Sequence, residues 1–434
     1  MSLREELEQL KPFEARAIIE NLRKGSVPVD YVPFFTVGRG NWLKFIEEDL
    51  DDYIAEGGAK VRFINGDYGD GKTHFMSVIR HLALQKGFAV SFVVLTREVP
   101  VHKFEVVYQT IVRQLRGTFE GAGIRRLVDG WADGLKSELK AKGGAPFDER
   151  VVALTESLRG LPGMDLSFAH ALAALAENRY RPRQEGEAEG ERAAAREVLY
   201  QWFEGAKVSK RALKPFQVFE ALDKTNSKRF LGSLIAFLRH LGHKGLILLM
   251  DELETVIAQS TSVRNASYEN VRLLIDNTEQ ASYLHIFLSI IPDVILSEKG
   301  FKSYDALWSR VRSIGEGKRL NYRSVLVDLH KTPLETDELV DLGLCLCRIH
   351  ELAYRWDTRE QIGEGLIKKM CAAQKRMGLL SEVRLFIKQV IRTLDMAEQG
   401  VAPDEEADLT EQVVASQREM DEEKVERLQP KWDS

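Results

Sequence analysis

The feature that most constrains the fold of this chain is a glycine-rich octapeptide at residues 66–73, with the sequence GDYGDGKT. It follows a short run of β-forming residues at 60–66 and precedes a helical pattern over 74–87. Glycines let the backbone N–H groups of such a loop curl around phosphate oxygens, and the N-terminus of the following helix adds its positive dipole end. Strand, loop and helix together predict the Walker A loop of a P-loop NTPase.

The octapeptide and the residue after it are the predicted nucleotide-binding residues: Gly66, Asp67, Tyr68, Gly69, Asp70, Gly71, Lys72, Thr73 and His74. Lys72 is expected to reach the β- and γ-phosphates of ATP, and the Thr73 hydroxyl is expected to ligate Mg²⁺. Asp67 and Asp70 add negative charge to a loop that binds an anion, so we expect both side chains to point to solvent. An ordinary glycine turn is the alternative, which the flanking strand and helix disfavour.

A second motif is the apolar run LILLMDE at residues 246–252, which ends in two acidic residues. A buried strand with this ending matches Walker B. Asp251 would hold Mg²⁺ through water, and Glu252 would orient and polarise the attacking water. Glu252 and Lys72 are therefore predicted catalytic residues. A core strand that meets the surface gives the same pattern, but the upstream loop favours the functional interpretation.

Further candidates follow from position along the chain. Ser289, near the end of an apolar strand, could sense the γ-phosphate or simply pack in the core. Arg310 and Arg312 follow that strand, where a neighbouring subunit's arginine finger often lies, and Arg310 is the preferred catalytic candidate. A solvated helix face is the alternative for both. Arg384, on a later helix, is suited to contact phosphate from the C-terminal helical region.

The surrounding pattern predicts an α/β fold with a parallel sheet. Residues 88–96 are rich enough in Val and Phe for a strand buried on both faces, and strand–helix–strand units of this length are typical of parallel sheets. The predicted divisions are an N-terminal helix and connector (1–36), a first part of the ATPase core (37–117), a large helical insertion (118–228), a second part of the core (229–320), a C-terminal helical subdomain (321–400) and an acidic tail (401–434).

Composition limits the partners and the compartment. A net charge of −5 and a pI near 6.1 give no overall basic field, so contact with nucleic acid needs a local patch. Two basic runs are candidates, although such runs are more often solvated surface: Lys207, Lys210, Arg211 and Lys214, and Arg179, Arg181 and Arg183. The N-terminus lacks a signal-peptide pattern, and no apolar run approaches the ~20 residues that span a bilayer. We expect a cytoplasmic protein without membrane contact.

Three cysteines are too few for a disulfide framework, which favours a reducing compartment. Cys345 and Cys347 with His350 suggest a zinc site, but they lie in an apolar-rich helical run and a second ligand pair is missing. Core packing is the favoured interpretation for these residues, and Cys371 is the third cysteine of the chain.

The motifs together resemble the AAA+ plan over residues 37–394, in the layout of origin-recognition ATPases. In that plan the segment 37–42, VGRGNW, helps to close over the adenine. A closer resemblance is to the ATP-binding protein family of BREX phage-defence systems, carried by residues 15–39, 66–75 and 248–254. The resemblance implies a prokaryotic protein that works with other defence-system proteins, often beside a helicase. No winged-helix pattern follows the Arg384 helix, which departs from the initiators and puts autonomous DNA binding in doubt.

The predicted function is ATP binding and hydrolysis with Mg²⁺, coupled to homo-oligomer assembly or to the remodelling or loading of a partner on double-stranded DNA. In such an assembly Arg310 would complete the site of a neighbouring subunit. A slow nucleotide-gated switch or scaffold is the alternative, and Glu252 favours hydrolysis because a switch does not need a water-activating carboxylate. A DNA-binding module with a degenerate ATPase is the third hypothesis. GTP also remains open, although no guanine-recognition motif is evident.

Overall fold

The computed structural model describes residues 7, 9–139, 145–182, 189–276, 281–311, 320–359, 362–379, 382–401 and 414. Arg183, Arg312 and nearly all of the predicted acidic tail lie outside these residues. The chain divides into two compact units. The first comprises Met1–Glu47, Arg62–His81 and Ser289–Ser434, and the second Glu48–Val61 and Leu82–Leu288.

A five-stranded sheet has the strand order β2-β3-β4-β1-β5. Its strands are β1 (Ala59–Asn65), β2 (Ala89–Val94), β3 (Leu246–Asp251), β4 (Leu284–Ile290) and β5 (Leu326–Asp328). The pairs β2–β3, β3–β4 and β1–β5 are parallel. Every residue of β3 and β4 is buried, which explains why both sequences are continuous apolar runs instead of alternating patterns. The predicted α/β fold with a parallel sheet is confirmed.

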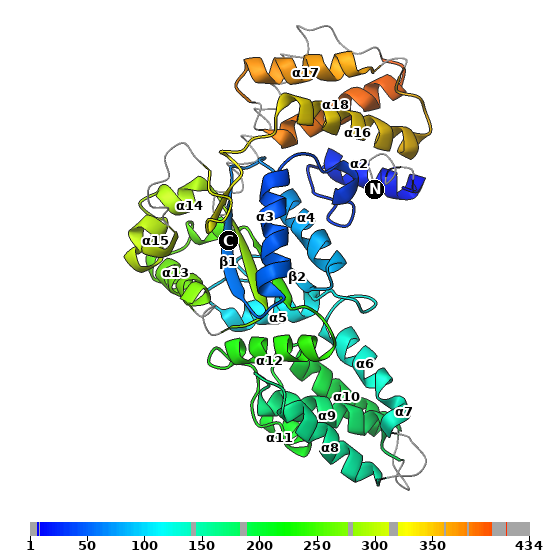
Figure 1. Cartoon of the computed structure of the whole chain (residues 1–434), viewed down its shortest axis with the longest axis vertical. Helices are drawn as coiled ribbons and strands as arrows, with labels where there is room; N and C mark the ends of the chain where they lie inside the picture. The colour runs from blue at the N-terminus through cyan, green and yellow to red at the C-terminus, as the bar shows by residue number, and fades with distance from the viewer. Residues whose placement is uncertain are drawn as a thin grey trace, which may run out of the picture. The chain divides into compact units, whose positions relative to one another are not determined.

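In the first unit, β1 leads through the glycine-rich loop into α4 (Lys72–Gln85). A group of four helices shares one hydrophobic core (Figure 1): α2 (Pro12–Arg23), α16 (Thr336–Tyr354), α17 (Glu364–Arg376) and α18 (Val383–Glu398). The shorter elements of this unit are η1 (Val32–Phe35), α14 (Pro292–Leu296), η6 (Phe301–Ser303) and α15 (Asp305–Val311), together with most of α3 (Gly40–Asp49). The chain leaves α2 at Gly25, which takes the left-handed conformation with φ +71°.

The cysteines belong to the core of this helical group, with two buried and one packed against them: Cys347, Cys371 and Cys345. His350 is buried as well, and its imidazole is hydrogen-bonded on both sides. Its Nδ1 accepts from the Trp356 indole at 2.8 Å, and its Nε2 lies 3.0 Å from the Asp395 carboxylate. Core packing of this run is confirmed.

In the second unit, helices fill the described chain between β2 and β3. They are α5 (Phe104–Gln114), α6 (Ile124–Gly134), α7 (Lys136–Leu139), α8 (Phe147–Arg159), α9 (Leu166–Tyr180), α10 (Glu189–Phe203), α11 (Lys210–Leu213), η3 (Lys214–Phe216) and α12 (Ser227–His240). The unit also contains η2 (Leu50–Ile54), η4 (Leu253–Val256) and α13 (Thr261–Asp276). Aromatic rings build the helical core, since Phe168 has four ring neighbours: Trp202, Phe203, Phe230 and Phe237.

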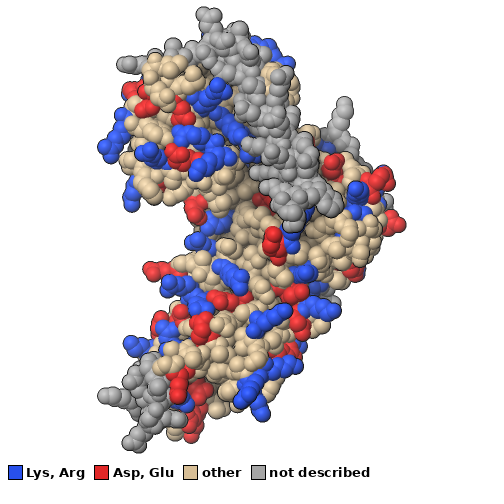
Figure 2. All heavy atoms as spheres, turned by 180° about the vertical axis from the view of Figure 1, so that it is seen from behind, with Lys and Arg blue, Asp and Glu red and all other residues tan. Residues whose placement is uncertain are grey.

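Surface charge is mixed. On the face seen in Figure 2, Lys and Arg side chains are interspersed with Asp and Glu, in keeping with the small net charge. Among the helices of the described residues, none has both the length and the apolar character that crossing a membrane requires.

Candidate functional site

The glycine-rich loop of the first unit is held in place by backbone hydrogen bonds. The Gly66 N–H donates to the carbonyl of Ile290, the last residue of β4, at 3.2 Å, and the Arg384 N–H donates to the Gly69 carbonyl at 3.4 Å. Gly69 and Gly71 have φ of +98° and +87°, in the left-handed region that favours glycine. The motif therefore forms a curled loop directly before a helix, as a phosphate-binding loop requires.

Lys72 lies inside this loop and is only 8% exposed. Its Nζ donates to the carbonyls of Gly66 at 2.8 Å and Asp67 at 3.1 Å, and it lies 5.2 Å from the centroid of the Tyr68 ring. These contacts fix a buried ammonium beside the loop N–H groups. A fixed cation in a site of low dielectric attracts an anion more strongly than a solvated one does.

The two loop aspartates differ, and the expectation that both face solvent is wrong for Asp70. Asp67 is exposed, but Asp70 is only 4% exposed, and its Oδ2 accepts the Asp67 N–H at 2.7 Å. The physical reason is that an N–H group in a tight loop needs an acceptor, and this carboxylate provides one. Burial raises the pKa of Asp70.

His330 lies against both loop aspartates. Its Nδ1 lies 3.3 Å from Oδ2 of Asp67 and 3.6 Å from Oδ2 of Asp70. One atom from each of these three side chains falls within 4.8 Å of the others, close enough to hold a cation. Acidic groups at a surface often gather without a metal, so this geometry alone does not assign one.

Arg39 ties the loop to the segment that follows β5. Its guanidinium donates to the carbonyls of Leu329 at 2.8 Å and Asp70 at 3.3 Å, and to both the carbonyl and the hydroxyl of Thr332. The Trp42 indole donates to the same hydroxyl at 3.1 Å. Burial lowers the pKa of Arg39 to about 10, so it stays protonated at neutral pH. The sequence singled out the 37–42 segment for a role at the adenine and missed this bracing contact.

His74, the residue after Thr73, faces the N-terminal connector. Its Nε2 lies 3.0 Å from the Thr36 hydroxyl, and its ring centroid lies 5.1 Å from that of Phe35. Burial lowers its pKa to about 4, so the imidazole is neutral at physiological pH. The connector and α4 are thereby joined next to the loop.

The acidic pair of the second unit forms a sharp turn at the end of β3. Asp251 is only 3% exposed, and its Oδ1 accepts the Glu252 N–H at 3.0 Å. Glu252 has φ of +63°, a left-handed conformation that is costly for a residue with a Cβ. The Thr255 hydroxyl donates to the Glu252 carbonyl at 3.0 Å and helps to hold the turn. The backbone of Asp251 and Glu252, from which the two carboxylates extend, is therefore held in a defined turn.

The remaining candidates lie in the first unit. Ser289 is fully buried in β4, directly before the residue whose carbonyl holds Gly66. Arg310 is exposed on α15, and its guanidinium donates to the Ala306 carbonyl of the same helix. Arg384 is the second residue of α18, and its N–H contacts the loop as described above. Its guanidinium lies so close to Gly25 that a Cβ there would come within 2.4 Å of it.

The α/β fold with its five-stranded parallel sheet, and a glycine loop that encloses a buried lysine between β1 and α4, are consistent with a P-loop NTPase. The chain belongs to the BREX system ATP-binding protein BrxC/D family, whose model matches residues 10–413. The resemblance to this phage-defence family is confirmed, and with it ATP binding as the property that its description gives. Comparison with curated proteins and with solved structures found no match.

Proposed function

We propose that this chain hydrolyses ATP with Mg²⁺ and uses the nucleotide state to assemble, or to remodel or load a partner of the BREX system on DNA. Lys72 would contact the β- and γ-phosphates, and Thr73 and Asp251 would hold the metal. Glu252 would orient and polarise the attacking water. The observation that carries the proposal is the Lys72 ammonium buried within its own loop, 2.8 Å from the Gly66 carbonyl.

Phosphoryl transfer depends mainly on positioned charge, because little covalent chemistry is asked of the protein. Such charge is supplied at fixed positions by the buried Lys72, the positive-φ glycines and the first turn of α4. Arg384 supports a further phosphate contact, since its backbone already bonds to Gly69. A nucleotide here would thus meet the C-terminal helical group as well as the loop.

The turn at Glu252 supports hydrolysis over binding alone. A non-glycine residue in the left-handed region costs on the order of 1 kcal/mol or more, and such strain is typically kept where the side chain must be aimed. A site that only binds nucleotide does not need a carboxylate to orient and polarise an attacking water. Arg310 is exposed, as a residue that completes the site of a neighbouring copy has to be.

A nucleotide-gated switch is the second candidate, and Asp70 is the observation that favours it. A buried carboxylate inside the loop repels an incoming phosphate and must be compensated before nucleotide binds. Slow exchange and slow turnover would follow, with a partner supplying the missing stabilisation.

The test is the ATPase rate as a function of protein concentration, with and without double-stranded DNA. Wild type is compared with Glu252→Gln and Arg310→Ala, and with Glu298→Gln and Arg359→Ala as exposed controls. A rate per subunit that rises with concentration and collapses only in the first two variants supports an assembling ATPase. Tight ATP binding without turnover in any condition, lost in Lys72→Ala, sinks hydrolysis by the isolated protein and leaves the switch.

A further inference from the structure

One segment of the second unit carries cations that are not neutralised. Lys207, Lys210, Arg211, Lys214 and Lys224, here called the basic rim, are all exposed. Within the described residues, none of the five forms an ion pair or a side-chain hydrogen bond. Other cations of the second unit behave differently, because Arg125, Arg159 and Arg179 each pair with acidic side chains. The basic rim is therefore a local positive patch on a chain of net negative charge.

One residue of the basic rim, Lys210, lines a hollow of about 440 Å³. Lys210 belongs to α11, and the loop before α12 contributes Phe219 to Asp223, Thr225 and Asn226. Lys210 and Lys214 are four residues apart in consecutive helical turns, a spacing that puts side chains on one face. Helix α11 packs on α10, and η3 packs on α9. The backbone that carries Lys210 and Lys214 is therefore held in place.

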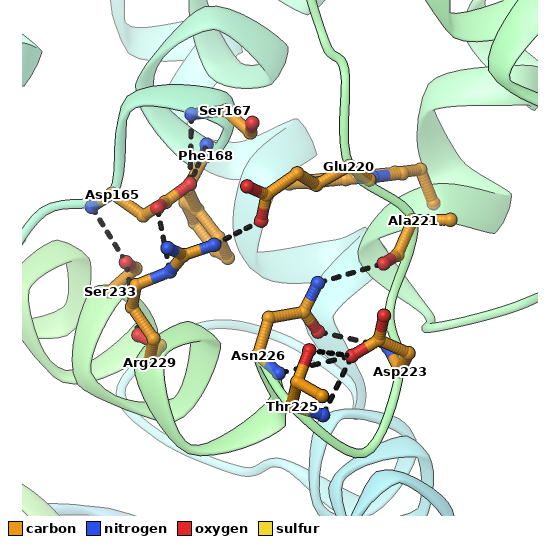
Figure 3. Close-up of polar contacts among 11 residues, drawn as sticks. Asp165, Ser167, Phe168, Glu220, Ala221, Asp223, Thr225, Asn226, Arg229 and Ser233 are labelled. Atoms are coloured by element: carbon orange, nitrogen blue, oxygen red, sulfur yellow. Dashed lines mark hydrogen bonds and ion pairs between the residues drawn. The ribbon is translucent and has the colours of Figure 1, made fainter.

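The acidic groups in the wall of the hollow are held by contacts within the protein (Figure 3). Arg229 forms ion pairs with Glu220 and with Asp165, the latter at 2.9 Å. Asp223 accepts hydrogen bonds from the N–H groups of Thr225 at 2.7 Å and Asn226 at 3.2 Å. In the lining itself, the two cations Lys210 and Arg229 balance the two carboxylates Glu220 and Asp223. The excess positive charge of this region comes from the other four cations of the basic rim.

An aromatic ring stands beside these cations. Phe219 lines the same hollow as Lys210 and is 60% exposed. Single exposed apolar side chains are common at protein surfaces, but an exposed ring leaves a π-face on which a base can stack. Exposed aromatics next to cations are what proteins use to bind single-stranded nucleic acid, because bases stack on the ring while lysines contact the phosphates.

We propose that the basic rim and Phe219 form a binding surface for single-stranded nucleic acid, with the cations on phosphates and the Phe219 ring on one base. The Asp223–Asn226 turn keeps the wall of the hollow rigid, since the Asn226 amide also bonds to the Ala221 carbonyl at 2.9 Å. This surface goes beyond ATP hydrolysis and does not depend on it. The two proposals can therefore fail separately.

The experiment is fluorescence anisotropy of a labelled oligothymidylate of about 20 nucleotides, titrated with the full chain in the absence of nucleotide. The test variants are the triple substitution Lys210→Ala/Arg211→Ala/Lys214→Ala and the single substitution Phe219→Ala. The charge-matched control is Lys302→Ala/Arg359→Ala/Lys368→Ala, three exposed and ion-paired cations of the first unit. Every substituted side chain is exposed, and circular dichroism melting checks that each variant folds.

We expect the triple variant to bind at least about 30-fold more weakly and to lose about 2 from the slope of log K against log salt, because each phosphate contact on a single strand contributes about 0.7. Phe219→Ala should weaken binding about tenfold. Lys72→Ala should bind the oligonucleotide like wild type, whatever happens to ATP.

Equal affinities for the triple variant and its control would overturn the proposal. Equally tight binding of a duplex, with no loss in Phe219→Ala, would refute the single-strand assignment and leave a phosphate-backbone contact only.

Discussion

The loop around Lys72 and the basic rim of the helical insertion both present cations, but they hold them in opposite ways. In the first unit, Lys72 and Arg39 are largely buried, and their N–H groups are bonded to backbone carbonyls. In the second unit, Lys210 and its neighbours are exposed and make no such bonds within the described residues. Lysine and arginine thus serve two kinds of recognition. A buried, fixed cation suits a single anion, whereas exposed, solvated cations suit a chain of anions.

The difference has energetic consequences. Removing a buried cation leaves its acceptors without a donor, at a cost of about 1–3 kcal/mol for each group. Removing a solvated lysine changes stability by no more than about 0.5 kcal/mol. Substitutions in the loop region should therefore alter both folding and nucleotide binding, whereas those in the basic rim should alter only binding that is sensitive to salt.

The largest expected effect is that of Lys72→Ala on nucleotide affinity. Loss of the fixed ammonium should weaken ATP binding at least about 100-fold, because a preorganised charge-assisted contact in a low-dielectric site is lost. Calorimetric titration with Mg²⁺–ATP measures the change, and Lys210→Ala is the matched control from the basic rim, expected to bind ATP normally. Similar affinities for both variants would abolish the distinction drawn between the two regions.

The second-largest effect should be the loss of stability caused by Arg39→Ala. The guanidinium satisfies the carbonyls of Leu329, Thr332 and Asp70, and its removal should lower the free energy of unfolding by about 3 kcal/mol. Urea denaturation measures this value, and Arg211→Ala, an exposed arginine of the basic rim, should change it by no more than about 0.5 kcal/mol. A loss below about 1 kcal/mol for Arg39→Ala would mean that water replaces the guanidinium without penalty.

Lys72 and Arg39 also show what could and what could not be predicted from the sequence. Lys72 and Asp251 were identifiable because their patterns are local: a loop between strand and helix, and an apolar strand that ends in acids. Arg39 bonds to residues about 290 positions later in the chain, which only the folded structure reveals. The burial of Asp70 was missed for a different reason, since a motif gives residue types but not which N–H group lacks an acceptor.

His74 offers a smaller, pH-dependent test of the buried region. Burial lowers its pKa from 6.5 to about 4, so the unfolded chain takes up the proton at higher pH than the folded one. Stability from this group is complete above about pH 6.5 and is lost as the pH falls toward 4. The expected loss is about 2 kcal/mol between pH 7 and pH 5.

The measurement is urea denaturation of wild type and His74→Gln at both pH values. Glutamine cannot titrate but can still bond to the Thr36 hydroxyl, so the difference between the two proteins isolates His74. An equal pH dependence in wild type and His74→Gln would show that the imidazole is solvated in the folded protein.

The smallest effect on ATP affinity should come from Asp70→Asn. Asp70 and Asp223 each accept a backbone N–H in a loop, so the same substitution can be compared at both positions. Asparagine keeps an oxygen acceptor for the Asp67 N–H but removes the negative charge from the phosphate loop. ATP affinity should therefore rise, by roughly fivefold, corresponding to about 1 kcal/mol of relieved repulsion. Asp223→Asn makes the same change in the turn beside the basic rim and should leave ATP affinity unaltered. If Asp70→Asn binds ATP no better than wild type, the buried carboxylate does not oppose the nucleotide, and the physical argument for a slow switch is removed.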